Sequence, residues 1–158
     1  MSRTHRILGL TALGLSVAGV GLSAYLTAAH YAASSILLCS STGAVDCAKV
    51  TTSSYSHIAG VPVAVLGLVY YLVMLGLCLP RSWADPRLRT PRTWAATGGM
   101  AFVAYLIYAE LYGVHAICLW CTAVHVVTFG LFAVVLGADF AAHEAAEPES
   151  RRDLSLRR

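Results

Sequence analysis

The sequence is short, apolar and weakly charged. It has 158 residues, of which 58% are hydrophobic and 12% are charged, and its formal net charge is +3. The mean hydropathy of +0.68 excludes an ordinary soluble domain of this size. We therefore expect the lipid bilayer to surround most of the chain, and we expect no nucleic-acid partner.

Four stretches with almost no charge are each long enough to cross the hydrocarbon core, which takes about 20 residues. Lipid forces every backbone N–H and C=O group to find an internal partner, so these stretches are predicted to be helices. The first is longer than the apolar core of a signal peptide, which is about 7–15 residues, and we expect it to be retained. The four stretches cover residues 7–29, 60–80, 94–114 and 117–138.

The predicted fold class is an all-α membrane protein built as a four-helix transmembrane bundle. Residues 1–138 form this domain, and residues 139–158 form a polar tail that we expect to be partly disordered. The loop at 30–59 is too long for a simple helix connection, and its segment 50–58 is predicted to be a short surface helix. The segment 81–92 is expected to be a plain connector.

The basic residues predict the orientation of the bundle. Of the 11 Lys and Arg residues, all except Lys49 lie near the termini or between the second and third stretches. The positive-inside rule therefore places both termini in the cytoplasm of a multi-pass protein of the cell membrane. The long loop and the start of the fourth stretch then lie on the outer face, where disulfides form and persist.

Four of the five cysteines form two pairs at this outer edge. Cys39 and Cys47 lie in the long loop, whereas Cys118 and Cys121 form a CxxC at the start of the fourth stretch. A thiolate of one pair can attack a disulfide of the other, so electrons can pass from loop to bundle. We interpret the two pairs as a redox relay rather than a structural staple.

The fourth stretch adds a histidine to this pattern. Cys118, Cys121 and His125 are spaced to share one helical face. The positive end of the helix dipole favours the thiolate form of Cys118. A small electron acceptor dissolved in the membrane is then expected to meet Cys121 and to receive a hydrogen bond from His125.

Other candidates carry less specific signals. Glu110, near the outer end of the third stretch, is interpreted either as a proton relay or as a carboxylate that reaches interfacial water. Cys78 has no partner within reach and is predicted to be a small buried hydrophobe. A stripe of tyrosines at helical spacing is predicted to pack in the core, with a place beside an aromatic ligand as the alternative; its members are Tyr105, Tyr108 and Tyr112.

Three motifs together resemble the vitamin K epoxide reductase family in its compact bacterial form. They are the loop cysteines within residues 38–50, the run Ser-Tyr-Ser-His-Ile-Ala-Gly-Val-Pro at 54–62, and the run Tyr-Ala-Glu-Leu-Tyr-Gly-Val-His-Ala-Ile-Cys-Leu-Trp-Cys at 108–121. Their order is that of the family, with the loop pair after helix one and the CxxC opening helix four. The resemblance covers about the first 138 residues.

The resemblance implies a role for each cysteine. Cys121 matches the cysteine that faces quinone, and Cys118 matches the one that exchanges with the loop. Cys47 matches the loop cysteine that forms the disulfide between the pairs. Cys39 matches the cysteine that meets an external thiol protein.

The resemblance also implies a quinone site with two departures from vertebrate relatives. Ser56 falls where they carry an asparagine that binds one quinone oxygen, and His125 falls where they carry a tyrosine that binds the other. The implied electron acceptor is a quinone of the menaquinone, ubiquinone or vitamin K type. Many bacterial members continue into a thioredoxin-like domain, so the expected partner here is a separate thioredoxin- or DsbA-like protein.

The implied function is that of a membrane thiol–disulfide oxidoreductase that supports disulfide formation. Three alternatives remain open. A DsbB-type oxidase has two outer cysteine pairs in the reverse order. A binding module would hold zinc through Cys118, Cys121, His115 and His125. We predict that the protein binds no metal. A structural tetraspan would keep permanent disulfides.

Overall fold

The computed structural model describes residues 3–32, 39 and 43–156, with side chains as far as residue 142. The protein is all-α, as predicted, apart from one two-stranded hairpin of β1 (His57–Ile58) and β2 (Val61–Pro62). Four helices are long: α1 (Arg3–Tyr31), α3 (Val63–Cys78), α5 (Arg89–Tyr108) and α6 (Leu119–Leu156). The shorter elements are α2 (Cys47–Thr51), α4 (Pro80–Ala84), the 3-10 turns η1 (Ser54–Ser56) and η2 (Pro86–Leu88), and the π-helical segment η3 (Ala109–Val114).

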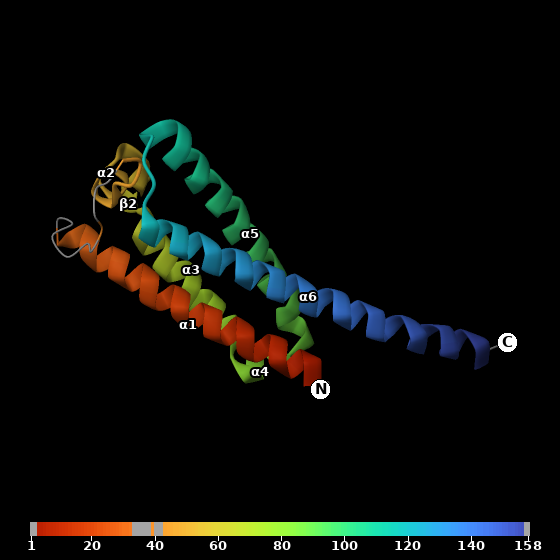
Figure 1. Cartoon of the computed structure of the whole chain (residues 1–158). Helices are drawn as coiled ribbons and strands as arrows, with labels where there is room; N and C mark the ends of the chain where they lie inside the picture. The colour runs from red at the N-terminus through yellow and green to blue at the C-terminus, as the bar shows by residue number, and fades with distance from the viewer. Residues whose placement is uncertain (1–2, 33–38, 40–42, 157–158) are drawn as a thin grey trace.

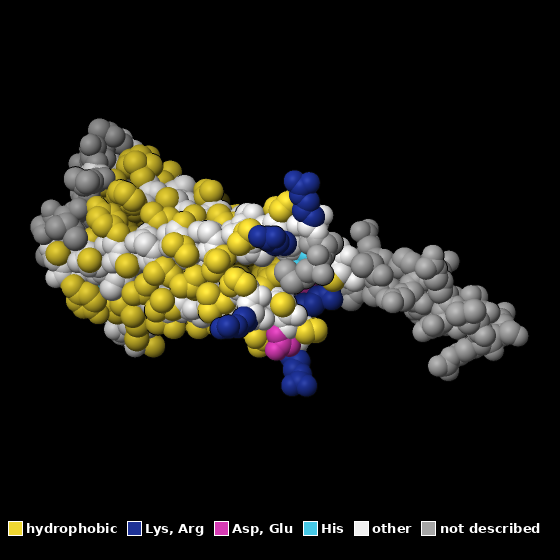
Figure 2. Space-filling model, turned by 90° about the horizontal axis from the view of Figure 1, so that it is seen from below, with side chains coloured by type: hydrophobic (Ala, Val, Ile, Leu, Met, Phe, Trp, Pro, Cys, Tyr) yellow, Lys and Arg dark blue, Asp and Glu magenta, His cyan; other side chains and the backbone are white. Residues whose placement is uncertain are grey.

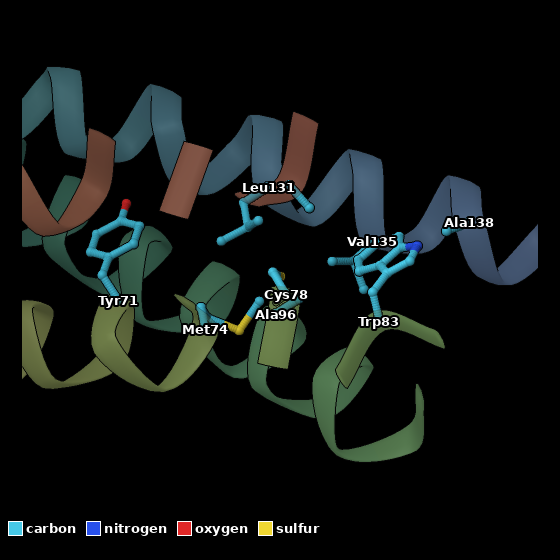
Figure 3. Close-up of a cluster of buried hydrophobic side chains, with 9 residues drawn as sticks. Tyr71, Met74, Cys78, Trp83, Ala96, Leu131, Val135 and Ala138 are labelled. Carbon is cyan, nitrogen blue, oxygen red and sulfur yellow. The ribbon is translucent and has the colours of Figure 1, made fainter. Parts of the chain in front are cut away.

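The long helices pack around a core at the end of the bundle that carries α4. Helix α1 lies against α3 and α6, and α5 lies mainly against α6 (Figure 1). Figure 3 shows the side chains that fill the space between them. Cys78 is among them and is 1% exposed, so its prediction as a buried hydrophobe is confirmed. The other core members are Ala12, Tyr71, Met74, Trp83, Ala96, Leu131, Val135 and Ala138.

Three segments differ from the sequence prediction. The surface helix expected over residues 50–58 is instead α2, because the Asp46 carboxylate caps it by accepting a hydrogen bond from the Lys49 N–H at 2.9 Å. The expected plain connector contains α4 and η2, each of which begins with a proline. Helix α6 continues to Leu156 through the tail expected to be partly disordered, a tail rich in the good helix formers Ala, Glu and Arg.

Two described helices are long and apolar enough to cross a membrane. They are Arg3–Tyr31 and the part of α6 at Leu119–Ala142, with mean hydropathies of 1.9 and 2.1. Helix α3 is apolar but shorter. Figure 2 shows Lys and Arg side chains gathered toward one end of the molecule and a broad hydrophobic surface beyond them.

Helix α1 has a close approach to α3 that gives a stability prediction. A Cβ atom added at Gly19 would lie 2.1 Å from the ring of Tyr71. That ring is held in place by two hydrogen bonds of its hydroxyl. The hydroxyl donates to the Val124 carbonyl at 3.0 Å and shares a hydrogen bond with Thr128 Oγ1 at 2.7 Å. We therefore expect Gly19→Ala to destabilise the protein by about 1–3 kcal/mol.

Gly21 is the matched control for this substitution. A Cβ atom added there meets nothing within 4 Å, so Gly21→Ala should be neutral or stabilising by up to about 1 kcal/mol. Thermal unfolding of both variants in detergent, followed by circular dichroism, measures the difference. Equal melting temperatures for the two variants would contradict the tight α1–α3 contact.

Candidate functional site

The long loop is held directly against the segment that precedes the CxxC. Val45 and Ile117 form an isolated parallel bridge. The Asp46 N–H donates to the Ile117 carbonyl at 3.1 Å, and the Ile117 N–H donates to the Ala44 carbonyl at 2.9 Å. Cys47 follows Asp46 in the loop, and Cys118 follows Ile117. The hydrogen bonds between these two segments therefore fix Cys47 beside Cys118.

Both cysteines belong to one buried cluster at this end of the bundle. Cys47 is 1% exposed and Cys118 is 0% exposed, and Cys39 and Cys121 pack against the cluster from its edges. Cys39 and Cys47 are joined by a disulfide, whereas Cys118 and Cys121 are free thiols. The structure thus brings together all four cysteines that the sequence analysis selected. The remaining cluster members are Val50, Val114 and Ala116.

The start of α6 gives the two cysteines of the CxxC different surroundings. Cys118 lies just before the helix, and its sulfur accepts a hydrogen bond from the Cys121 N–H at 3.3 Å. A helix N-terminus is a position in which negative charge on sulfur is stabilised. Cys121 lies one turn further on and lines a cavity together with His125. Cys121 and His125 thus face the cavity from one side of α6, and Cys118, next to Cys121, also belongs to the cluster that contains Cys47.

The cavity lies between the four long helices and is the natural place for a ligand. It has a volume of about 410 Å³ and is lined mostly by apolar side chains. Volumes of about 300–1,000 Å³ with few polar groups are usual for small-molecule sites. Its walls include Leu26 of α1, Gly67 of α3 and Phe102 of α5. Cys121 is the cysteine that reaches it.

Ser56 and His125 both line this cavity, as the sequence analysis expected of two ligand contacts. His125 is 5% exposed. The Ser56 hydroxyl donates to the Ser53 carbonyl at 2.7 Å or to His57 Nδ1 at 3.0 Å, so its proton already has partners inside the protein. Ser56 can still accept a hydrogen bond, whereas His125 offers a ring nitrogen to the cavity.

Glu110 is more closely tied to the cysteines than its position in the sequence suggested. It is 8% exposed, and its carboxyl lines the cavity together with Cys121, close to the Cys121 thiol and the Cys118 N–H. The backbone supports this position, since the Glu110 carbonyl accepts a hydrogen bond from the Ala116 N–H at 3.2 Å. Of the two sequence interpretations, a carboxylate that reaches interfacial water is therefore wrong, because the side chain turns inward.

The tyrosine stripe was predicted to pack in the core, and this prediction is wrong. Tyr105, Tyr108 and Tyr112 are 42%, 60% and 68% exposed. They share one face, as their spacing requires, but that face is exposed and does not pack in the core. Tyr108 and Tyr112 stack on each other instead, with ring centroids 5.1 Å apart. Exposed tyrosines near the end of an apolar helix suit a membrane interface.

The zinc alternative finds no support in the described part of the chain. No three His, Cys, Asp or Glu side chains converge there closely enough to hold a metal ion. His115 is exposed and has left-handed backbone angles in the turn between η3 and α6, whereas His125 is buried below Cys121. These two histidines therefore do not share a site.

Sequence reasoning missed some of the residues that shape the cavity. Tyr70 lines it, and its buried hydroxyl has no hydrogen-bond partner among the described residues. Gly99 makes room for that ring, since a Cβ atom there would lie 2.4 Å from the Tyr70 hydroxyl. Nothing in an apolar run distinguishes such residues, because the pattern does not say which side of the helix faces a cavity.

One comparison with known proteins bears on this arrangement. Residues 10–136 match the model of a family described as the vitamin K epoxide reductase family. The match covers most of the chain, including both cysteine pairs and the helices that enclose the cavity. The chain belongs to the vitamin K epoxide reductase family and is a membrane redox enzyme of the thiol–disulfide and quinone reductase kind.

Proposed function

We propose that this protein passes electrons from an exported thiol protein, through Cys39 and Cys47 and then Cys118 and Cys121, to a quinone in the membrane. The net result is a disulfide in the thiol protein and a quinol in the bilayer. The observation that carries this proposal is the joint burial of Cys47 and Cys118 under the Val45–Ile117 bridge. Thiol–disulfide exchange requires the two sulfurs to meet, and the shared cluster keeps the two cysteines close enough for small movements to bring them together.

The relay consists of three steps, of which the first two are thiol–disulfide exchanges and the third is the reduction of the quinone. A reduced partner protein gives its electrons to the Cys39–Cys47 disulfide and becomes oxidised. The Cys47 thiolate then attacks Cys118 of an oxidised CxxC, which releases Cys121 as a thiol; Cys39 resolves the mixed disulfide and leaves the CxxC reduced. Finally the Cys118–Cys121 pair closes its S–S bond and transfers two electrons and two protons to the quinone. Each 30 mV of favourable potential in such a step contributes about 1.4 kcal/mol.

The cavity supports the quinone as the final acceptor. Its apolar walls suit a prenylated ring and exclude water, and Cys121 is the thiol within its reach. His125 is suited to bind one quinone oxygen, and Ser56 retains lone pairs for a weaker polar contact. A ring of the menaquinone, ubiquinone or vitamin K type has the right chemistry for these walls.

The same proposal includes the membrane arrangement. Helices α1, α3, α5 and α6 cross the membrane as a four-helix bundle, with both termini in the cytoplasm and the cysteine pairs outside. The buried Arg92 packs over the ring of Trp83 at 4.0 Å, at the end of the bundle where the arginines gather. The thiol donor is a separate thioredoxin- or DsbA-like protein, and Cys39, which is only partly buried, is the cysteine that it meets.

Trapping the central exchange tests this relay. In the double variant Cys39→Ala/Cys121→Ala, neither resolving thiol is present, so Cys47 and Cys118 should oxidise to a stable disulfide with each other. Peptide mass spectrometry of the membrane-embedded protein, without reduction, detects that bond. Cys78 is the internal control, because it lies in the core at the other end of the bundle and should stay a free thiol.

Two results would contradict the proposed order. One is a double variant in which Cys47 and Cys118 both stay reduced under oxidising conditions. The other is a mixture in which Cys78 pairs as readily as Cys118, since this would mean that the bond forms only after the protein has unfolded.

A further inference from the structure

Glu110 is a buried carboxylate that the electron route does not use. It lies in η3, the π-helical segment between α5 and the turn into the CxxC, and 8% of it is exposed. Both the His115 N–H and the Ala116 N–H donate to its carbonyl, so the same turn fixes Glu110 and the start of α6. Its distance from the reactive thiols is therefore set by local backbone hydrogen bonds.

No lysine or arginine forms an ion pair with Glu110 in the described part of the chain. The salt bridge found there joins Arg89 to Asp139, at the opposite end of the bundle. Lys49, the cation of the outer loop, is exposed on α2. A carboxylate buried in a membrane protein without a cation is costly, and ionisable groups in such positions usually serve a functional site. Structural support alone does not account for Glu110.

The neighbours of Glu110 are the reacting groups themselves. Its carboxyl lines the same cavity as Cys121 and His125, and it lies close to the Cys121 thiol and the Cys118 N–H. A molecule in the cavity that touches the Cys121 sulfur is therefore also within reach of this carboxyl. The arrangement has the two contacts that a proton carrier needs, one to the proton donor and one to the acceptor site.

We propose that Glu110 is a catalytic residue that carries one proton from the Cys121 thiol to an oxygen of the quinone. This inference rests on the function proposed above. The Cys118–Cys121 dithiol loses two electrons and two protons as its S–S bond forms, and the quinone gains both and becomes a quinol. The Glu110 carboxylate takes the Cys121 proton and then, as a carboxylic acid, gives it up. The Cys118 thiol supplies the second proton, and Glu110 ends the step unchanged.

A single-turnover measurement isolates this step from the thiol donor. Fully reduced protein, freed of dithiothreitol, is mixed with menadione, and both quinone absorbance and free thiols are followed. For Glu110→Gln we expect the rate at saturating menadione to fall about 100-fold, the usual scale for a lost general base. The half-saturating menadione concentration should stay within about threefold, because the change affects the reaction and not the binding.

Two variants separate proton transfer from a structural role. Glu110→Asp keeps a carboxyl and should react at least about tenfold faster than Glu110→Gln. Tyr112→Phe changes an exposed neighbour in the same segment and should react like wild type. As a folding control, Glu110→Gln added to the Cys39→Ala/Cys121→Ala background should still form the Cys47–Cys118 disulfide. If that disulfide does not form, Glu110→Ala replaces Glu110→Gln in the rate measurement. Formate added to Glu110→Ala is then expected to restore the rate.

The possible failures are distinguishable. A Glu110→Gln protein that reacts at the wild-type rate, or a Glu110→Ala protein that formate does not rescue, overturns the role of Glu110 and leaves the relay intact. A wild-type protein whose Cys118 and Cys121 thiols are never oxidised by menadione overturns the proposed function as well.

Discussion

Replacing Cys121 with alanine should abolish quinone reduction with every electron donor. Cys121 is the cysteine that lines the cavity, so in the proposed relay its loss removes the sulfur that reduces the quinone. We expect turnover to fall by at least about 10³-fold, the scale on which loss of a reacting nucleophile acts. Quinone absorbance, recorded in detergent with either a reduced thioredoxin-like protein or dithiothreitol as donor, measures the effect.

Two further variants in the same assay show whether the loss is specific. Cys78→Ala changes a buried cysteine of the core at the other end of the bundle and should keep near-normal turnover. His125→Leu should mainly raise the KM for quinone, because His125 contributes to the cavity wall and not to the sulfur chemistry. If Cys121→Ala retained turnover with dithiothreitol, another group would have to deliver the electrons.

Replacing Cys47 with alanine should separate the two donors from each other. Cys47 lies buried in one cluster with Cys118, and in the proposed relay it links the loop to the CxxC. Without it, electrons from a protein donor have no intramolecular path, and turnover with that donor should fall about 10²-fold or more. Dithiothreitol is small enough to reduce the CxxC directly, so activity with it should remain.

This donor dependence also discriminates between the enzyme and a structural tetraspan. If the loop disulfide were permanent and only structural, Cys47→Ala would lower the melting temperature. Any turnover would then fall equally with both donors, and neither rate would change selectively. Melting temperatures recorded beside the rates separate these cases. Equal loss of activity with protein donor and dithiothreitol would contradict the relay order and favour a purely structural role for the loop disulfide.

Hydropathy, spacing and residue type were enough to predict the all-α fold, both cysteine pairs and His125 as a cavity residue. These predictions hold because each depends on local rules. An apolar run must be helical in lipid, and residues four apart on a helix share a face, as Cys121 and His125 do. The tyrosine stripe shows the limit of the same rule. Tyr105, Tyr108 and Tyr112 do share a face, but spacing does not say which neighbour that face meets.

The amino-acid sequence by itself therefore determined the class of the protein, its redox chemistry and its family. Only the tertiary structure decided that Cys47 is buried beside Cys118, because the Val45–Ile117 bridge joins segments far apart in the chain. It also decided that Glu110 turns inward to the Cys121 thiol, which depends on the π-helical turn at the end of α5. Contacts between distant segments follow from the packing of the whole bundle, and no local pattern encodes them.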